Sequence, residues 1–373
     1  MDTSDSNIVF DGSGVCNHCH DYDSNIRHRV FSGDAGRRAL AEKVEEIKNA
    51  GRNKKYDCII GVSGGVDSTF VAYQTKQLGL RPLAVHLDNG WNSELAVNNI
   101  HEALKRLQID LHTHVIDWEE FKDLQLAFLR ASTPDSEIPS DHAIFALMRQ
   151  MADKIGVRYI ISGFNARTES HLPRSWSQGH GDWKYIKSIQ RRFGRSPLKT
   201  YPRMTFINQL RWGRTQEWLD ILNYVDYVKT DALVVLERDL GWRNYGGKHF
   251  ESLYTRFYQG YILPKKFGFD KRKTHLSSLV CSGELTREQA LHQLREEPYS
   301  VALQNEDREY VIGKFGLTEG EFDVILAAPP ASFWDFPSYA KWYDTWWFHA
   351  LQRTNRAAKR ALSFFRGRPN SSN

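Results

Sequence analysis

The sequence predicts an α/β fold with a doubly wound parallel sheet and a mainly helical C-terminal region. Short apolar runs, typical of buried strands, begin at residues 58, 82 and 159, and segments with helical spacing separate them. A glycine-rich turn joins the first of these strands directly to a helix. Strands that alternate with helices form right-handed βαβ units, which build a parallel sheet and bind ligands at the carboxyl ends of its strands.

The predicted elements follow in chain order. A helix is expected over residues 36–48, because Leu40, Val44 and Ile47 recur at helical spacing. The sheet domain then consists of strand 58–62, helix 69–78, strand 82–87, helix 95–107, strand 111–116, two more helices and strand 159–162.

After residue 166 this alternation ends. Glycine and proline break up the stretch that follows, at Pro173, Gly179, Gly181, Gly194 and Pro197. We expect this stretch to be a long irregular connection, and residues 203–328 to be mainly helical. The chain therefore divides into an N-terminal module with a cysteine pair (1–55), an α/β domain (56–170), a helical substrate-binding region (171–330) and an aromatic, basic tail (331–373) whose residues 353–368 are helix-like.

Composition limits the class of protein. Hydrophobic residues make up 41% and charged residues 25% of the 373 positions, which excludes a fibrous or disordered chain. The net charge of +5 is the small difference between 50 cations and 45 anions, which argues against a protein built mainly to coat nucleic acid. A local basic site stays open as an alternative, although no nucleic acid partner is expected. The sequence contains neither a signal peptide nor an apolar run of membrane-spanning length, so we expect a cytoplasmic protein without membrane insertion.

The turn after the first strand is the most specific motif of the sheet domain. It reads Ser63, Gly64, Gly65, Val66, Asp67 and Ser68. Glycine lets backbone N–H groups point at a ligand, serine adds hydroxyl donors, and the helix that begins here favours anions through its dipole. It is not a Walker turn, because the lysine of that motif is missing. The alternative is an ordinary capped turn, since Ser and Asp favour helix N-termini.

A buried strand followed by S-G-G-x-D-S resembles the PP-loop ATP pyrophosphatase superfamily, which has an adenine-nucleotide alpha-hydrolase-like fold. The resemblance implies that this turn binds the pyrophosphate of ATP, that AMP passes to a substrate oxygen, and that Asp67 is linked to Mg²⁺, which prefers hard oxygen ligands. It also implies nucleotide contacts after two later strands. The residues expected there are His86, Asp88, Gly163, Asn165, Thr168 and Glu169. For the first two, a polar loop that merely closes a strand is the alternative.

Motifs in the second half are more specific. Segments 246–252, 263–278, 281–284 and 286–288 resemble the N-acetyl sugar amidotransferases, and the resemblance extends from about residue 7 to about residue 291. These enzymes of lipopolysaccharide, O-antigen and related surface-glycan synthesis convert an acetamido group on a sugar into an acetamidino group. The resemblance implies that ATP adenylates the amide oxygen, which makes it a leaving group that ammonia then replaces.

This chemistry assigns roles to polar residues. Catalytic roles are expected for Lys248, His249, Lys271, Arg272 and His275. Substrate contacts are expected for Asp135, Asp141, Glu251 and Lys266. Asp141 is equally well explained as a helix N-cap, and residues 265–275 as a solvated run of charge.

The ammonia source is expected to be a separate glutaminase subunit, as the resemblance also implies. An N-terminal-nucleophile glutaminase needs a cysteine at the start of the mature chain, and residue 2 is Asp. A triad glutaminase needs an α/β domain of its own, for which no region is left.

The cysteine pair Cys16 and Cys19 has the spacing of half a zinc site. The resemblance implies another C-x2-C pair just before the first residue of this sequence. Either this sequence starts inside the natural one or this member has lost two ligands, which leaves zinc open, with His18, His20 or Cys281 as the residues that could substitute. Plain burial is the alternative.

The rival interpretation is a PP-loop enzyme that modifies tRNA by thiolation or lysine transfer, with residues 174–214 contacting RNA. The third interpretation is a non-catalytic partner protein that retains only nucleotide binding.

Overall fold

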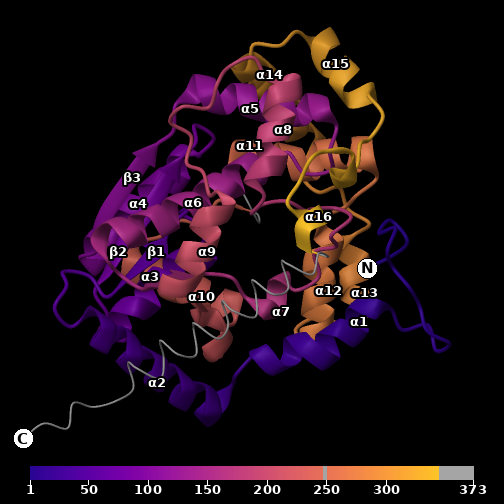
Figure 1. Ribbon diagram of the computed structural model, residues 1–373. Helices are drawn as coiled ribbons and strands as arrows, with labels where there is room; N and C mark the ends of the chain where they lie inside the picture. The colour runs from indigo at the N-terminus through magenta and orange to yellow at the C-terminus, as the bar shows by residue number, and fades with distance from the viewer. Residues whose placement is uncertain (247–249, 344–373) are drawn as a thin grey trace, which may run out of the picture.

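A computed structural model describes residues 1–246 and 250–343 of the protein (Figure 1). Its centre is a five-stranded sheet in the order β3-β2-β1-β4-β5. All four strand pairings are parallel, which confirms the predicted fold class. The strands are β1 (Cys58–Gly61), β2 (Pro82–Asp88), β3 (Asp110–Val115), β4 (Tyr159–Ser162) and β5 (Glu217–Asp220). The strand order reverses between β1 and β4, which is where open α/β sheets bind ligands.

Helices cover both faces of the sheet. The crossover helices are α3 (Val66–Gln77), α4 (Glu94–Leu107), α5 (Trp118–Ala131) and α6 (Ile138–Ile155). Because side chains alternate along a strand, Ile59 and Ile160 belong to one buried core, with α5 and α6, whereas Ile60 and Ile161 belong to the other, with α3 and α4. The sheet is therefore buried on both faces, as its apolar strands require.

The connection between β4 and β5 differs from the sequence expectation. It contains α7 (Ala166–Glu169), α8 (Trp183–Phe193) and α9 (Phe206–Thr215). The irregular connection predicted here was wrong over α8, which buries Tyr185, Ile186 and Ile189 on one face and is capped by Asp182. Its apolar residues do have helical spacing, but the glycines and prolines on either side obscured it. Strand β5 was also missed, because its four residues contain no apolar run.

The N-terminal residues form α1 (Asn17–Asp21), a short π-helix η1 (Tyr22–Ile26), a 3-10 turn η2 (Arg27–Arg29) and α2 (Gly33–Gly51). Helix α2 packs on the core through Leu40, Val44 and Ile47, the three residues that predicted it. The first residues contact segments that lie far along the chain. The Lys273 ammonium donates to Asp2 across 2.5 Å, and the Ser175 hydroxyl donates to Asp5 across 2.6 Å.

The C-terminal region is helical, as predicted, within the described residues. Its elements are η3 (Ile221–Tyr224), α10 (Lys229–Leu240), α11 (Leu253–Phe257), η4 (Tyr258–Phe267), α12 (Arg272–Ser282), α13 (Arg287–Gln293), α14 (Val301–Phe315), α15 (Glu319–Ala327), η5 (Phe333–Asp335) and α16 (Ala340–Tyr343). The expected helix-like tail at 353–368 lies outside the described residues. No helix in the described part of the chain has the length and apolarity needed to cross a membrane.

Backbone and side-chain contacts join this region to the sheet domain. The segment before α11 pairs with the loop after β2, since the Ser93 N–H donates to the Glu251 carbonyl and the Leu253 N–H donates to the Trp91 carbonyl, both across 2.9 Å. From α14, the Lys314 ammonium donates to the Gly90 carbonyl and lies 4.7 Å from the centre of the Trp91 ring. The C-terminal region is thus fixed against the ligand-binding edge of the sheet.

Candidate active site

Residues 63–68, called here the SGGVDS turn, leave the carboxyl end of β1 and open α3 at the point where the strand order reverses. Gly64 has φ +82°, and a Cβ there would lie 2.5 Å from the Ala96 carbonyl oxygen. Only glycine fits this position without strain. The Trp242 indole donates to the Gly64 carbonyl across 2.9 Å, so the turn is held from α4 on one side and from the segment after α10 on the other.

The two serines of the turn face each other. The hydroxyl oxygens of Ser63 and Ser68 lie 3.1 Å apart, and the Ser68 hydroxyl also accepts from the Ser63 N–H across 3.2 Å. The Gly65 N–H donates to the Ser63 hydroxyl across 3.3 Å. Hydroxyl and N–H donors therefore gather at the N-terminus of α3, an arrangement that suits the oxygens of a phosphate.

Asp67 lies in the first turn of α3 and accepts a hydrogen bond from the Tyr227 hydroxyl. Burial and the Asp67 charge raise the pKa of Tyr227, so this phenol stays protonated and donates. The charge of Glu169 also acts on Tyr227, so the predicted residues Asp67 and Glu169 both lie near this phenol. Two carboxylates here form a donor set that suits Mg²⁺, which binds proteins through one or two carboxylates while phosphates fill other positions.

The loop after β4 packs directly on the SGGVDS turn. A Cβ at Gly163 would lie 3.4 Å from the backbone of Asp67 and Ser68. Asn165 caps α7 by accepting from the Arg167 N–H across 2.9 Å. These contacts bring both predicted nucleotide-binding segments together.

His275 comes from α12 but lies at the same loop. Its Nδ1 is 2.9 Å from the Thr168 carbonyl oxygen, and because a carbonyl only accepts, Nδ1 is the protonated nitrogen. The structure therefore places a predicted catalytic histidine against a predicted nucleotide-binding residue.

His86 and Asp88 shape the end of β2. His86 is buried, its Nδ1 lies 2.8 Å from the Val62 carbonyl oxygen, and its Nε2 lies 3.2 Å from the Asn92 amide nitrogen. Burial lowers the pKa of His86, so its ring is neutral at pH 7. The Asp88 carboxylate accepts from the Gly90 N–H across 2.9 Å. These observed contacts favour a supporting role for His86, whose two ring nitrogens both have protein partners.

A second group of polar residues, called here the carboxylate cluster, opens α6. It consists of Asp135, Glu137, Asp141, His180 and Lys271. His180 Nε2 lies 3.4 Å from Asp135 and 3.3 Å from Asp141, while Lys271 Nζ lies 3.4 Å from Glu137. The cluster joins three predicted residues to two that were missed, Glu137 and His180. The N-cap of α6 is Glu137, so the alternative of Asp141 as an N-cap was wrong.

Charges within the carboxylate cluster support one another. Burial lowers the pKa of His180, but hydrogen bonds to Asp135 and Asp141 outweigh it and raise this pKa to about 10. Burial alone raises the pKa of Asp135, but His180 and Lys271 lower it to about 2. Burial raises the pKa of Glu137, against the opposing charge of Lys271. Two cations therefore lie among three acidic side chains.

Ser177 belongs to the same cluster without forming a hydrolytic triad. Its hydroxyl donates to Asp135 and lies 3.1 Å from His180 Nε2. A triad needs the carboxylate on the other ring nitrogen of the histidine, whereas here the serine and both aspartates share Nε2. The arrangement therefore suits the binding and protonation of a ligand rather than nucleophilic attack by the serine.

The cluster borders a small cavity of about 10 Å³, room for one water molecule. Asp135, Ser177 and Lys271 line it together with Leu172, Trp176, Tyr258 and Leu263.

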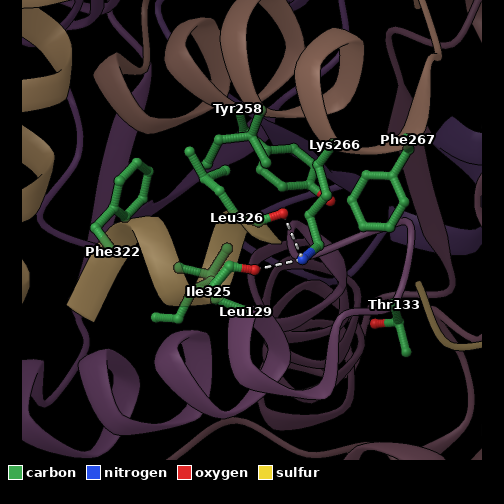
Figure 2. Close-up of a pocket in the computed structure, with 9 residues that line it drawn as sticks. Leu129, Thr133, Tyr258, Lys266, Phe267, Phe322, Ile325 and Leu326 are labelled. Carbon is green, nitrogen blue, oxygen red and sulfur yellow. Dashed lines mark hydrogen bonds between the residues drawn. The ribbon is translucent and has the colours of Figure 1, made fainter. Parts of the chain in front are cut away.

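Lys266 and Arg272 have mainly structural contacts. Lys266 lies in a largely apolar pocket, where its ammonium donates to the carbonyls of Ile325, Leu326 and Ala328 at the end of α15 (Figure 2). Burial lowers the pKa of Lys266 to about 8. The Arg272 guanidinium binds Asp270 across 2.7 Å and the Glu296 carbonyl across 2.9 Å.

Glu251 lies close to the SGGVDS turn. Its carboxylate contacts the Tyr245 hydroxyl, which also reaches the backbone of Val66. Predicted catalytic residues Lys248 and His249 lie outside the described residues.

Three of the four cysteines come together. Cys16 and Cys19 have their sulfur atoms 3.5 Å apart, and Cys281 of α12 lies against Cys19. Burial and Cys19 raise the pKa of Cys281 to about 12. Within residues 1–246 and 250–343, no three His, Cys, Asp or Glu side chains are arranged to hold a metal ion, so zinc at Cys16 and Cys19 is not supported.

The second half of the chain has a recognisable relative. The family model described as LPS biosynthesis protein WbpG-like, C-terminal domain, matches residues 251–351. Residues 251–351 are called here the WbpG-like domain after this match. The WbpG-like domain begins at Glu251 and contains Lys271, Arg272 and His275.

Two solved structures are similar to the chain at low identity. NMN synthetase from Francisella tularensis is 14% identical, with 68% of this chain and 95% of that chain covered and a TM-score of 0.33. The NH3-dependent NAD synthetase from Campylobacter jejuni subsp. jejuni, solved in complex with nitrate, is also 14% identical, with 75% and 96% covered and a TM-score of 0.32. The search of curated proteins gave no match.

Placing the WbpG-like domain on the fold shows what it contributes. Lys271 joins the carboxylate cluster, and His275 contacts the loop after β4. Tyr227, which contacts Asp67, and His180 were not identified from the sequence. Neither lies in a motif. His180 lies in the long connection between β4 and β5, and Tyr227 lies between η3 and α10, so each reaches its partner only through the tertiary fold.

Proposed function

We propose that this protein is an ATP-dependent amidotransferase, forming AMP and pyrophosphate, that converts the acetamido group of an N-acetylated sugar into an acetamidino group in lipopolysaccharide, O-antigen or related surface-glycan synthesis. The observation that supports it most is the meeting of the SGGVDS turn, the loop after β4 and α12 of the WbpG-like domain at one edge of the sheet. The match of residues 251–351 to a family of LPS biosynthesis proteins supports the pathway.

In the proposed reaction, the amide oxygen attacks the α-phosphorus of ATP, and pyrophosphate leaves toward the SGGVDS turn. Ammonia then adds to the activated carbon, AMP departs with the original amide oxygen, and a proton is lost to give the amidine. Atoms balance: N-acetyl sugar, ATP and ammonia give acetamidino sugar, AMP and pyrophosphate. Adenylation is needed because an amide oxygen is a poor leaving group.

The residues take roles that follow from their positions. Asp67 and Glu169 would hold Mg²⁺, which neutralises phosphate charge when bound. His275 is the candidate for moving a proton, since its ring is held in one tautomer by the Thr168 carbonyl. The carboxylate cluster offers carboxylates to accept from sugar hydroxyls and two cations to meet an acidic group on the sugar or its carrier.

Ammonia is proposed to come from a separate glutaminase subunit. In the test below, free ammonium replaces that partner, so the chain can be studied alone.

The test measures pyrophosphate released from ATP and Mg²⁺ with ammonium chloride and a panel of N-acetylated nucleotide sugars and sialic-acid-like sugars. For a sugar that supports release, ¹⁸O placed in its acetamido group should appear in AMP. The Asp67→Asn variant should lose activity, whereas Asp231→Asn, an exposed acidic residue in the first turn of α10, is the matched control.

Release without transfer of ¹⁸O would contradict adenylation of the amide. Silence across the sugar panel, together with release on adding tRNA, would favour the tRNA-modifying alternative.

A further inference from the structure

Tyr227 is fixed in place by contacts on several sides. Its side chain is buried, and its ring packs on Phe70 of α3 with the ring centres 5.3 Å apart. Phe70 lies one helical turn after Asp67, so the same helix carries both the surface that positions the ring and the carboxylate that its hydroxyl contacts. The Arg167 guanidinium donates to the Tyr227 carbonyl across 3.4 Å.

The partner of Tyr227 is the residue on which the proposed cation chemistry depends. The Tyr227 hydroxyl donates to Asp67 Oδ1. An aspartate in the first turn of a helix can adopt several rotamers, and choosing one of them on ligand binding costs conformational entropy. A buried hydrogen bond that selects the rotamer beforehand removes that cost.

A phenol suits this task better than a basic side chain. Arginine or lysine would neutralise the carboxylate and compete with a divalent cation for it. A neutral hydroxyl orients the carboxylate and leaves its negative charge in place. Glu169, whose charge also acts on Tyr227, adds to the negative potential at this position.

We infer that Tyr227 is a positioning residue, which holds the Asp67 carboxylate in one orientation at the N-terminus of α3, ready to bind the divalent cation that accompanies ATP. The inference rests on the proposed function only in taking ATP with Mg²⁺ as the ligand. It concerns the binding of that pair and does not depend on which acceptor receives AMP.

The experiment compares Tyr227→Phe with the wild type in binding a non-hydrolysable analogue of ATP, α,β-methylene-ATP, by isothermal titration calorimetry. With Mg²⁺ present, affinity should fall about tenfold, as expected for losing a hydrogen bond to a charged group. With EDTA in place of Mg²⁺, the two proteins should bind the analogue equally. Tyr224→Phe is the matched control. Tyr224 lies in the same segment between β5 and α10 as Tyr227, but its ring stacks on Phe31.

A double-mutant cycle with Asp67→Asn separates positioning from a general effect on folding. In the Asp67→Asn background, Tyr227→Phe should have no further effect on the Mg²⁺-dependent affinity. In turnover, the Mg²⁺ concentration at half-maximal rate should rise about tenfold, while kcat at saturating Mg²⁺ stays within about twofold of the wild type.

Two outcomes would overturn the inference. One is an unchanged Mg²⁺-dependent affinity in Tyr227→Phe. The other is an equal loss with Mg²⁺ and with EDTA, which would assign Tyr227 to the fold alone. Because the calorimetric arm needs no acceptor, it remains decisive if no sugar supports pyrophosphate release.

Discussion

The Nδ1 atom of His275 donates to the carbonyl oxygen of Thr168 across 2.9 Å, and this bond joins α12 to the loop after β4. The side-chain amide of asparagine can place an N–H donor close to the position of Nδ1, while the imidazole is removed. We therefore expect His275→Asn to preserve ATP binding and to lower kcat by a factor of about 10² or more, the usual range for a lost acid–base group. Rapid-quench measurement of pyrophosphate formation gives kcat, and an unchanged value would assign His275 a purely structural role.

Gly64 provides a test of the SGGVDS turn. In Gly64→Ala, a left-handed φ and a Cβ 2.5 Å from the Ala96 carbonyl should lower the free energy of unfolding by more than about 1 kcal/mol and weaken ATP binding. Gly213→Ala is the control, because that glycine lies inside α9 with open space around it. The control should be neutral or stabilising by up to about 1 kcal/mol, and urea denaturation measures both. Equal effects of the two substitutions would refute the argument.

A substitution at Lys266 tests whether this predicted substrate-binding residue has a structural role instead. Lys266→Met removes the donor to three carbonyls at the end of α15, and we expect a loss of about 1–3 kcal/mol in the free energy of unfolding with little change in the KM for the sugar. Lys265→Met, at the neighbouring position where Lys265 Nζ lies over the Tyr261 ring, is the control. A raised KM at unchanged stability would restore the substrate-binding prediction.

Because of His180, we expect the free energy of unfolding to change with pH in the alkaline range. Its pKa rises from 6.5 to about 10 on folding, so the folded state binds the proton more tightly. The stabilisation is fully present below pH 6.5 and is lost as the pH rises through 10. The free energy of unfolding should therefore fall between these values, and more steeply in the wild type than in His180→Asn. Parallel curves from urea titrations at pH 6.5, 8 and 9.5 would contradict this expectation.

Arg256 and Asp307 form a nearly buried pair, with N–O distances of 2.9 and 2.6 Å. Asp307→Ala leaves the guanidinium buried without this partner, and we expect a loss of about 3–5 kcal/mol. Exposed Asp323, which pairs with Arg308 across 2.8 Å, serves as the control, and Asp323→Ala should cost less than about 1 kcal/mol. Thermal denaturation of the two variants separates these outcomes.

The sheet could be predicted because short stretches of sequence are enough to indicate most of its strands. Strands β1, β2 and β4 are apolar runs of four to seven residues, and the turn after β1 has a specific pattern. Strand β5 could not be predicted in this way, because its place beside β4 is set by pairing across the sheet and not by its own composition.

The same contrast between local sequence signals and tertiary contacts applies to the residues of the candidate site. Asp67 and Gly163 follow apolar strands, so their convergence at one sheet edge follows from the topology. His180 and Tyr227 lie in connections whose path is fixed by tertiary contacts, and nothing in their neighbouring residues marks them. The roles of these residues and the division into domains stay predictions.

The salt bridge between Asp2 and Lys273 also limits how early the N-terminal segment can dock during synthesis. Asp2 is synthesised first, but its partner follows 271 residues later. At about 5–20 residues per second, the ribosome adds that stretch in roughly 15–55 s. During this interval the N-terminal segment cannot reach its final position, so its docking onto α12 must be a late step of folding during synthesis.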